Sequence, residues 1–142
     1  MGTFLLCVAL VLVLVLAACT HFREFEKPVT VDDIVKSAME LEGTSVTVNG
    51  YLDFDYEARN LWSNKGVLSA IQSGNVPVTD PSWNRCVALH NYDKWRKFLQ
   101  RRNKSNVVVT GIVRIFREKD YFLLGACSEI GISISSIHVF AN

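Results

Sequence analysis

Catalytic signatures are missing from the sequence. It contains no GxSxG, HExxH, P-loop or dinucleotide-binding pattern, and it has only three histidines. His21 is expected in a solvated linker and His138 partly buried in a terminal strand. His90 follows Cys86 by four residues, which on a strand separates them by about 13 Å. One zinc ion with ligand bonds of about 2.0–2.3 Å cannot bind both. We therefore predict no catalytic residue, no metal site and no cofactor.

Long apolar runs are also scarce, apart from one at the N-terminus. No charged side chain occurs from Phe4 to Ala18, yet this run is shorter than the roughly 20 residues of a membrane-spanning helix. It fits the apolar region of a signal peptide. The run ends in LAAC, which resembles a bacterial lipobox, a motif in which a peptidase cuts before the cysteine and the thiol then carries diacylglycerol. We predict a signal peptide over residues 1–18 and lipidation of Cys19.

The first residues lack the Lys or Arg that usually opens such a signal, so an uncleaved anchor and an ordinary signal peptide remain alternatives. Thr20 follows the predicted lipidation site. The resemblance to bacterial lipoproteins then implies sorting to the outer membrane, with the folded part facing the periplasm. We predict a tether over residues 19–28 and one domain over residues 29–142, a length typical of a single domain.

A strong charge imbalance is absent as well. The net charge of +1 provides no general attraction to nucleic acid. Of the four cysteines, Cys7 leaves with the signal peptide and Cys19 is lipidated, so Cys86 and Cys127 remain. A disulfide is the default expectation for two such thiols in an oxidising compartment. No CxxC motif accompanies them, so the bond is expected to be structural.

Helical and strand periodicity alternate along the mature part of the chain. Thr30 is predicted to cap a first helix that ends near Gly43 and packs on the domain. Asn91 is predicted to cap a second helix with Leu99 on its apolar side. One or two helical turns are expected within residues 64–74. Strands are predicted over residues 44–54, 58–63, 85–90, 105–118, 119–127 and 131–140.

Glycine interrupts two similar strand segments, SVTVNGYL at Gly50 and NVVVTGIV at Gly111. Such glycines predict bends or bulges in a small, strongly curved sheet. The order strand, strand, strand, helix, strand, strand is that of an OB-fold, a partly open Greek-key barrel, here with one additional terminal strand. The predicted fold class is therefore mainly β with two helices.

The chain from Val29 to Val139 resembles small OB-fold-like proteins that Gram-negative bacteria export or tether as lipoproteins. The segments that carry the resemblance are GTSVTVNGYL with Leu61, VVVTGIV and LLGACSEIGI. The third and fifth strands of an OB-fold are neighbours. The resemblance therefore implies that Cys86, in the predicted third strand, bonds to Cys127 at the end of the predicted fifth.

The predicted second helix is strongly basic. Lys94, Lys97, Arg101 and Lys104 recur at steps of three and four, and Arg96 and Arg102 lie beside them. A basic face behind an apolar stripe is commonly the solvated side of a packed helix. The functional alternative is contact with anionic headgroups or with a polyanion such as lipopolysaccharide or a cell-wall glycan.

Aromatic residues gather near the first two strands and the loop before the third. OB-folds bind oligonucleotides and oligosaccharides on this side of the barrel, which makes these side chains candidates for ligand contact. Ordinary core packing and loop anchoring is the favoured reading. The residues are Tyr51, Tyr56, Trp62 and Trp83.

Three carboxylates, Asp53, Asp55 and Glu57, alternate at the end of the first strand. Such a set can hold a cation, but a solvated strand end and turn is the expected reading.

Together these features predict a lipid-anchored envelope protein that faces the periplasm and acts as a non-enzymatic binding or structural module. The expected partners are the membrane, through the lipid, and an envelope protein or glycan, with no nucleic acid. The alternative is a secreted single-domain enzyme, or an enzyme inhibitor, whose site is not recognisable in the sequence.

Overall fold

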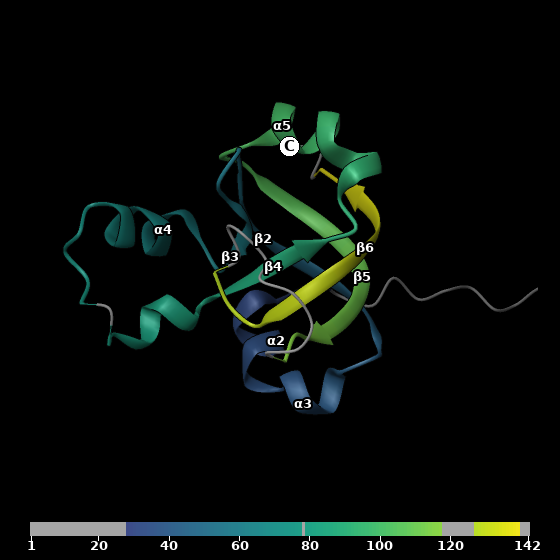
Figure 1. Cartoon of the computed structure of the whole chain (residues 1–142), viewed down its shortest axis with the longest axis horizontal. Helices are drawn as coiled ribbons and strands as arrows, with labels where there is room; N and C mark the ends of the chain where they lie inside the picture. Colours follow the sequence, from purple (N-terminus) through teal and green to yellow (C-terminus); the bar gives the residue numbers. More distant parts are fainter. Residues whose placement is uncertain (1–27, 78, 118–126, 140–142) are drawn as a thin grey trace, which may run out of the picture.

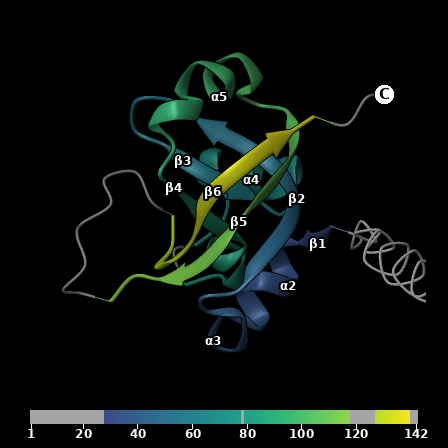
Figure 2. The same cartoon turned by 90° about the vertical axis from the view of Figure 1, so that its right-hand side faces the viewer.

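The computed structural model describes residues 28–77, 79–117 and 127–139. Its centre is a sheet of six strands in the order β1-β2-β3-β4-β6-β5. β2 also pairs with β5, so β2 to β6 close into a barrel of five strands (Figures 1 and 2). The strands are β1 (Val29–Thr30), β2 (Ser45–Phe54), β3 (Arg59–Trp62), β4 (Cys86–His90), β5 (Asn106–Ile115) and β6 (Ile130–His138).

The connections within the barrel are those of an OB-fold. β2 runs antiparallel to both β3 and β5, and β4 is antiparallel to β3. β6 is antiparallel to β5 but parallel to β4. A helical segment joins β4 to β5, as in OB-folds. The predicted OB-fold-like class is therefore confirmed.

The two strand glycines lie where the barrel turns sharply. The first seven residues of β2 pair with β5 and the last four pair with β3, so β2 changes partner just after Gly50. A Cβ on Gly50 would lie 2.5 Å from Cγ of Leu61. β5 shifts register just before Gly111, where a Cβ would lie 2.3 Å from the carbonyl oxygen of Ser133. Both predicted interruptions are confirmed.

Helices cover both ends of the barrel (Figure 1). α2 (Val31–Lys36) and α3 (Ala38–Leu41) lie at one end. The 3₁₀ turn η2 (Asp93–Trp95) and helix α5 (Arg96–Arg102) lie at the other. Val31 and Ile34 from α2 and Leu99 from α5 are fully buried in the same core cluster as the barrel strands, so each cap is part of the hydrophobic core.

Thr30 caps α2, as the sequence predicts. Its hydroxyl accepts a hydrogen bond from the Asp33 amide at 3.1 Å, and the Asp33 carboxylate accepts one from the Thr30 amide at 3.0 Å. This reciprocal pair is a capping box. The predicted single helix is divided in two at Ser37. Gly43, with φ of +80°, follows the helical region as expected.

A side lobe is inserted between β3 and β4. It contains α4 (Lys65–Gln72), the helical turns that the sequence predicts, and the 3₁₀ turn η1 (Pro81–Asn84). Figure 1 shows α4 projecting from the flank of the barrel. The side chain of Asn64 accepts a hydrogen bond from the Val67 amide and caps α4. Val67, Leu68 and Ile71 form a second, smaller core on the outside of the barrel.

The strand assignment near the C-terminus needs correction. The segment 119–127, predicted as the fifth strand, lies outside the described residues except for Cys127, which is not in a strand. β6, predicted as an additional terminal strand, is the fifth strand of the barrel, because it pairs with both β4 and β5. His138, predicted to be partly buried, lies at the exposed end of β6.

The start of the second helix also differs from the prediction. Asn91 does not cap it: its φ is +53°, and neither η2 nor α5 has a side-chain cap. The predicted signal peptide, Cys19 and the tether up to residue 27, including His21, lie outside the described residues. Among the described helices, none has the length and apolar character needed to cross a membrane.

Candidate functional site

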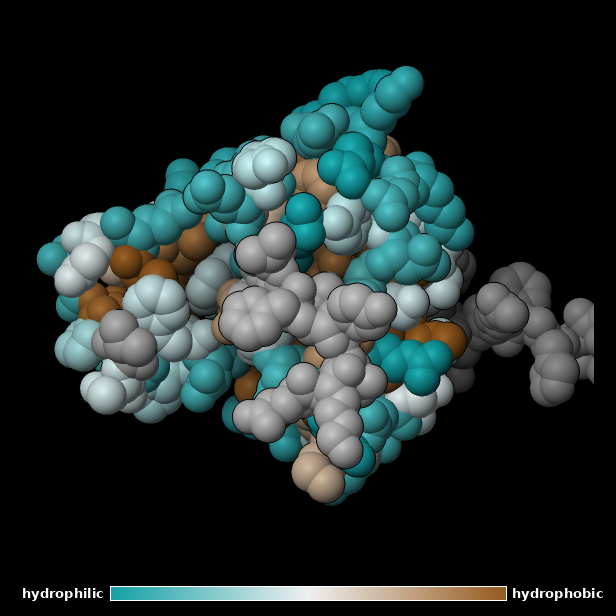
Figure 3. Space-filling view, viewed as in Figure 1, coloured by the Kyte–Doolittle hydropathy of each residue, from teal (hydrophilic) through white to brown (hydrophobic). Residues whose placement is uncertain are grey.

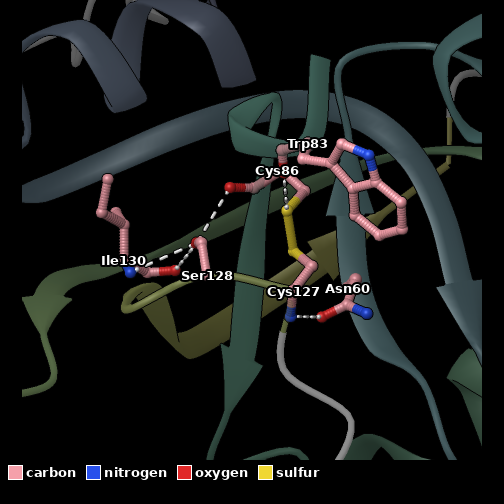
Figure 4. Close-up of a disulfide and its surroundings, with 6 residues drawn as sticks. All are labelled: Asn60, Trp83, Cys86, Cys127, Ser128 and Ile130. Carbon is pink, nitrogen blue, oxygen red and sulfur yellow. Dashed lines mark hydrogen bonds between the residues drawn. A yellow bond between two sulfur atoms is a disulfide. The ribbon is translucent and has the colours of Figure 1, made fainter. Parts of the chain in front are cut away.

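The outer face of β3 and β4 is covered by the chain's own later residues. Cys86 of β4 forms a disulfide with Cys127, with Cα atoms 6.2 Å apart, so the predicted pairing is confirmed. The Cys127 amide donates to Oδ1 of Asn60 at 3.0 Å. The hydroxyl of Ser128 lies 3.1 Å from the Cys86 carbonyl oxygen (Figure 4). A covalent bond and two hydrogen bonds therefore fix this segment to the sheet.

The far end of the same face is covered by Phe116. Its ring stacks on His90, with centroids 3.9 Å apart and an interplanar angle of 15°. It also crosses Gly131 of β6, where a Cβ would lie 2.5 Å from the Phe116 ring. Burial lowers the pKa of His90 below its usual 6.5, which keeps the imidazole neutral. His90 therefore packs against an aromatic ring, and Cys86, at the other end of β4, is held in the disulfide.

Most of the predicted ligand-facing aromatics are structural. Tyr51 is 8% exposed and Trp62 is 4% exposed, both packed in the side-lobe core beneath α4. Trp83 packs half-buried against the same core, beside the disulfide (Figure 4). Only Tyr56 of the four is open to solvent, at 92% exposure. Tyr51 and Trp62 therefore pack in a core, the favoured reading, and do not face a ligand, because the α4 insertion covers their rings.

The acidic set does not converge on one point. Asp53 is buried and forms an ion pair with Lys104, contrary to the solvated strand end that we expected. Asp55 accepts hydrogen bonds from the Glu57 and Ala58 amides at 2.8 Å, an arrangement that organises the β2–β3 turn. No group of three or more His, Cys, Asp or Glu side chains suited to a metal occurs within residues 28–77, 79–117 and 127–139.

The basic end of the barrel differs from the predicted helical stripe. α5 ends at Arg102, so Lys104 lies beyond it, with φ of +62°, and pairs with Asp53. We define the α5 surface as four exposed cations without an acidic partner among the described residues: Lys94, Lys97, Arg101 and Arg102. In Figure 3 this end of the molecule is strongly hydrophilic.

Arginine side chains also flank Tyr92, next to the α5 surface. The guanidinium carbons of Arg59 and Arg96 lie 4.8 and 5.3 Å from the Tyr92 ring centroid. Arg96 also bonds to Asp93 at 2.7 Å. The edge of Phe54 meets the Tyr92 ring with centroids 5.6 Å apart. Cation–π contacts of this kind orient guanidinium groups at a fixed position on the surface.

Charge is divided between the two ends of the barrel. Residues 91–104, at the α5 end, carry six Lys or Arg and one Asp, a net charge of +5. Residues 31–44, at the α2–α3 end, carry one Lys and four Asp or Glu, a net charge of −3. Contacts from elsewhere in the chain offset part of this difference, since Arg85 pairs with Asp32, Arg117 with Glu42, and Asp53 with Lys104.

No protein-family model matches the chain, and no curated protein matches it either. Solved structures similar to it include two OBodies. One is OBody AM3L15 bound to hen egg-white lysozyme, with 17% sequence identity, a TM-score of 0.48, and 82% of this chain and 96% of that chain covered. The other is OBody AM2EP06 bound to hen egg-white lysozyme, with 17% identity, a TM-score of 0.41, and coverage of 71% and 83%.

Proposed function

We propose that the chain is a lipid-anchored, non-enzymatic binding module of the bacterial cell envelope, sorted to the outer membrane and facing the periplasm. The observation that carries this proposal is the disulfide between Cys86 and Cys127. Disulfides persist in exported proteins and are rare in the reducing cytosol. The bond therefore supports the export that the LAAC signal predicts.

The buried polar groups favour a structural scaffold over a substrate cleft. Asp53 and Asn60 are the two buried polar or charged residues among those described. Asp53 pairs with Lys104, and Asn60 accepts from the Cys127 amide, so both hold the barrel and its covering segment together. Charged groups available to a partner lie instead on the outer surface, at α5. This distribution supports binding through the surface.

Mass spectrometry of the mature N-terminus tests the anchor. We expect the protein from a Gram-negative host to begin at Cys19 with a diacylglycerol thioether, and to sediment with outer membranes. The Cys19→Ser variant should lose the lipid and leave the outer-membrane fraction. A mature N-terminus elsewhere, or an unmodified Cys19, would contradict the proposal.

Affinity capture from crosslinked envelopes tests the binding role. We expect a defined envelope protein or glycan to be recovered with the wild-type chain and lost when the fold is disrupted, for example by Gly111→Val. If no partner is recovered, and a strain without this protein loses a chemical activity, the secreted-enzyme alternative is favoured instead.

A further inference from the structure

We propose that the α5 surface binds an extended polyanion bearing phosphate or carboxylate groups. This inference deepens the proposed function, because the anchor would place that surface within the envelope. The binding chemistry itself depends only on the four cations, Lys94, Lys97, Arg101 and Arg102.

The first support is that two acids next to the α5 surface are already paired with other cations. Asp93 bonds to Arg96 at 2.7 Å, and buried Asp53 pairs with Lys104. These two contacts neutralise charges beside the α5 surface rather than on it. The four remaining cations are exposed, and no carboxylate among the described residues pairs with them. Salt or an anionic partner relieves the mutual repulsion between them.

The second support is that the cations are mounted on a rigid support. Leu99 of α5 is fully buried, and Trp95 and Phe98 pack against the same core. The ammonium group of Lys94 lies 5.3 Å from the Trp95 ring centroid. Lys97 and Arg101 are one helical turn apart, about 6 Å along the axis. The surface thus offers positive charges along a line, which suits a chain of regularly spaced anions better than a single ion.

The third support concerns orientation relative to the membrane. β2 runs from the α3 end of the barrel to the α5 end, since Gly43 and Thr44 bond to Val113, and Phe54 bonds to Asn103. β1 is parallel to β2, so the chain enters the fold from the α2–α3 side. An anchor that held the α2–α3 end towards the bilayer would present α5 to the periplasm. A polymer is therefore a better fit than headgroups.

Binding of the full lipidated chain to labelled polymers, followed by fluorescence anisotropy, tests the proposal. The chain would be held in nanodiscs of neutral lipid, and the probes would be inorganic polyphosphate and polygalacturonate. If four cations each neutralise one phosphate, log K falls with log salt at a slope of about −0.7 per contact, as for single-stranded nucleic acid. Raising salt from about 50 to 200 mM should then weaken polyphosphate binding about 50-fold.

A matched pair of variants identifies the surface. K97Q/R101Q/R102Q leaves one of the four cations, so the same salt change should weaken binding only about threefold. K36Q/K65Q/R114Q removes the same charge from exposed positions elsewhere and should behave like the wild type. Equal losses in both variants would overturn the proposal, since net charge would then be the cause. Absence of binding to either polymer at low salt would overturn it too.

Nanodiscs containing anionic phosphatidylglycerol separate the membrane from the polymer. If α5 faces away from the bilayer, polymer affinity at about 150 mM salt should change less than about threefold, because the Debye length is about 8 Å. Loss of polymer binding on anionic discs would place the α5 surface on the membrane and overturn the proposal. The polymer titration and both variants are repeated in free solution with a chain that begins at Thr20 and carries no lipid. A failure of the anchor prediction, read by mass spectrometry, is therefore distinguishable from a failure of polymer binding.

Discussion

Removing the Cys86–Cys127 disulfide tests both the fold and the compartment. The two cysteines are 41 residues apart in the sequence, and Cys86 is fully buried. Closing a loop of that length stabilises the folded state by about 4 kcal/mol in the chain-entropy model. A domain of this size has a total stability of about 5–15 kcal/mol. We expect Cys86→Ala with Cys127→Ala to lower Tm by about 20 °C, at about 5 °C per kcal/mol.

Thermal unfolding followed by circular dichroism measures this shift. Reductant added to the wild type should produce most of the same fall in Tm, because the reduced protein keeps both sulfur atoms and loses only the bond. The comparison separates the loop constraint from the packing of Cys86. A variant that melts within about 5 °C of the wild type would refute the reasoning, since the bond would then contribute about 1 kcal/mol or less.

Three further predictions concern single contacts, each measured by urea unfolding. Lys104→Met should destabilise the fold by roughly 3 kcal/mol, because it leaves the buried Asp53 carboxylate unpaired; Asp53→Asn with Lys104 intact should cost less. The hydrogen bonds from Arg85 lower the pKa of Asp32 below its ordinary value of 3.8. This pair therefore stabilises the fold at neutral pH, and the contribution is lost as the pH falls through the lowered pKa of Asp32. Arg85→Gln should therefore cost about 1 kcal/mol or less at pH 7, and the difference from the wild type should disappear in acid. Gly111→Ala should cost about 1–3 kcal/mol, because its Cβ would lie 2.3 Å from a β6 carbonyl oxygen; a neutral effect would show that the bulge can relax.

Local sequence signals predicted the parts of the fold that depend on neighbouring residues. Thr30 caps α2 because its hydroxyl and Asp33 are three residues apart, a relation visible in the sequence. Gly50 and Gly111 mark the sharp bends because only glycine fits where another strand approaches closely. Strand periodicity located all five barrel strands, although residues 131–140 were predicted as an additional strand rather than as the fifth.

The local sequence does not show which strands or side chains pair when they lie far apart in the chain. Residues 119–127 and 131–140 are both apolar enough for a strand, and strand periodicity does not show which one pairs with β4. The disulfide prediction succeeded although its strand assignment was wrong, because Cys127 lies only three residues before β6 and is still carried to β4. The link between Lys104 and Asp53 spans 51 residues and likewise has no local signature.

The burial of Tyr51 and Trp62 was partly visible in the sequence. Val67, Leu68 and Ile71 lie on one side of α4, a pattern that indicates a helix packed on an apolar surface. A helix with one apolar side, inserted between the second and third barrel strands, has to bury that side against other apolar side chains. The nearby rings of Tyr51 and Trp62 provide this contact. That signal agrees with core packing, the reading favoured over ligand contact for these rings.

Closure of the β3–β4 face bears directly on where a partner can bind. A ligand on that face would first have to displace Phe116 from His90, and such a ring contact is worth about 0.5–1.5 kcal/mol beyond its area burial. It would also meet Cys127, which the disulfide prevents from moving away. The cations of the α5 surface are already exposed, so a partner there displaces only water and salt ions. The same bond that stabilises the barrel therefore favours binding at its α5 end over the face between β3 and β4.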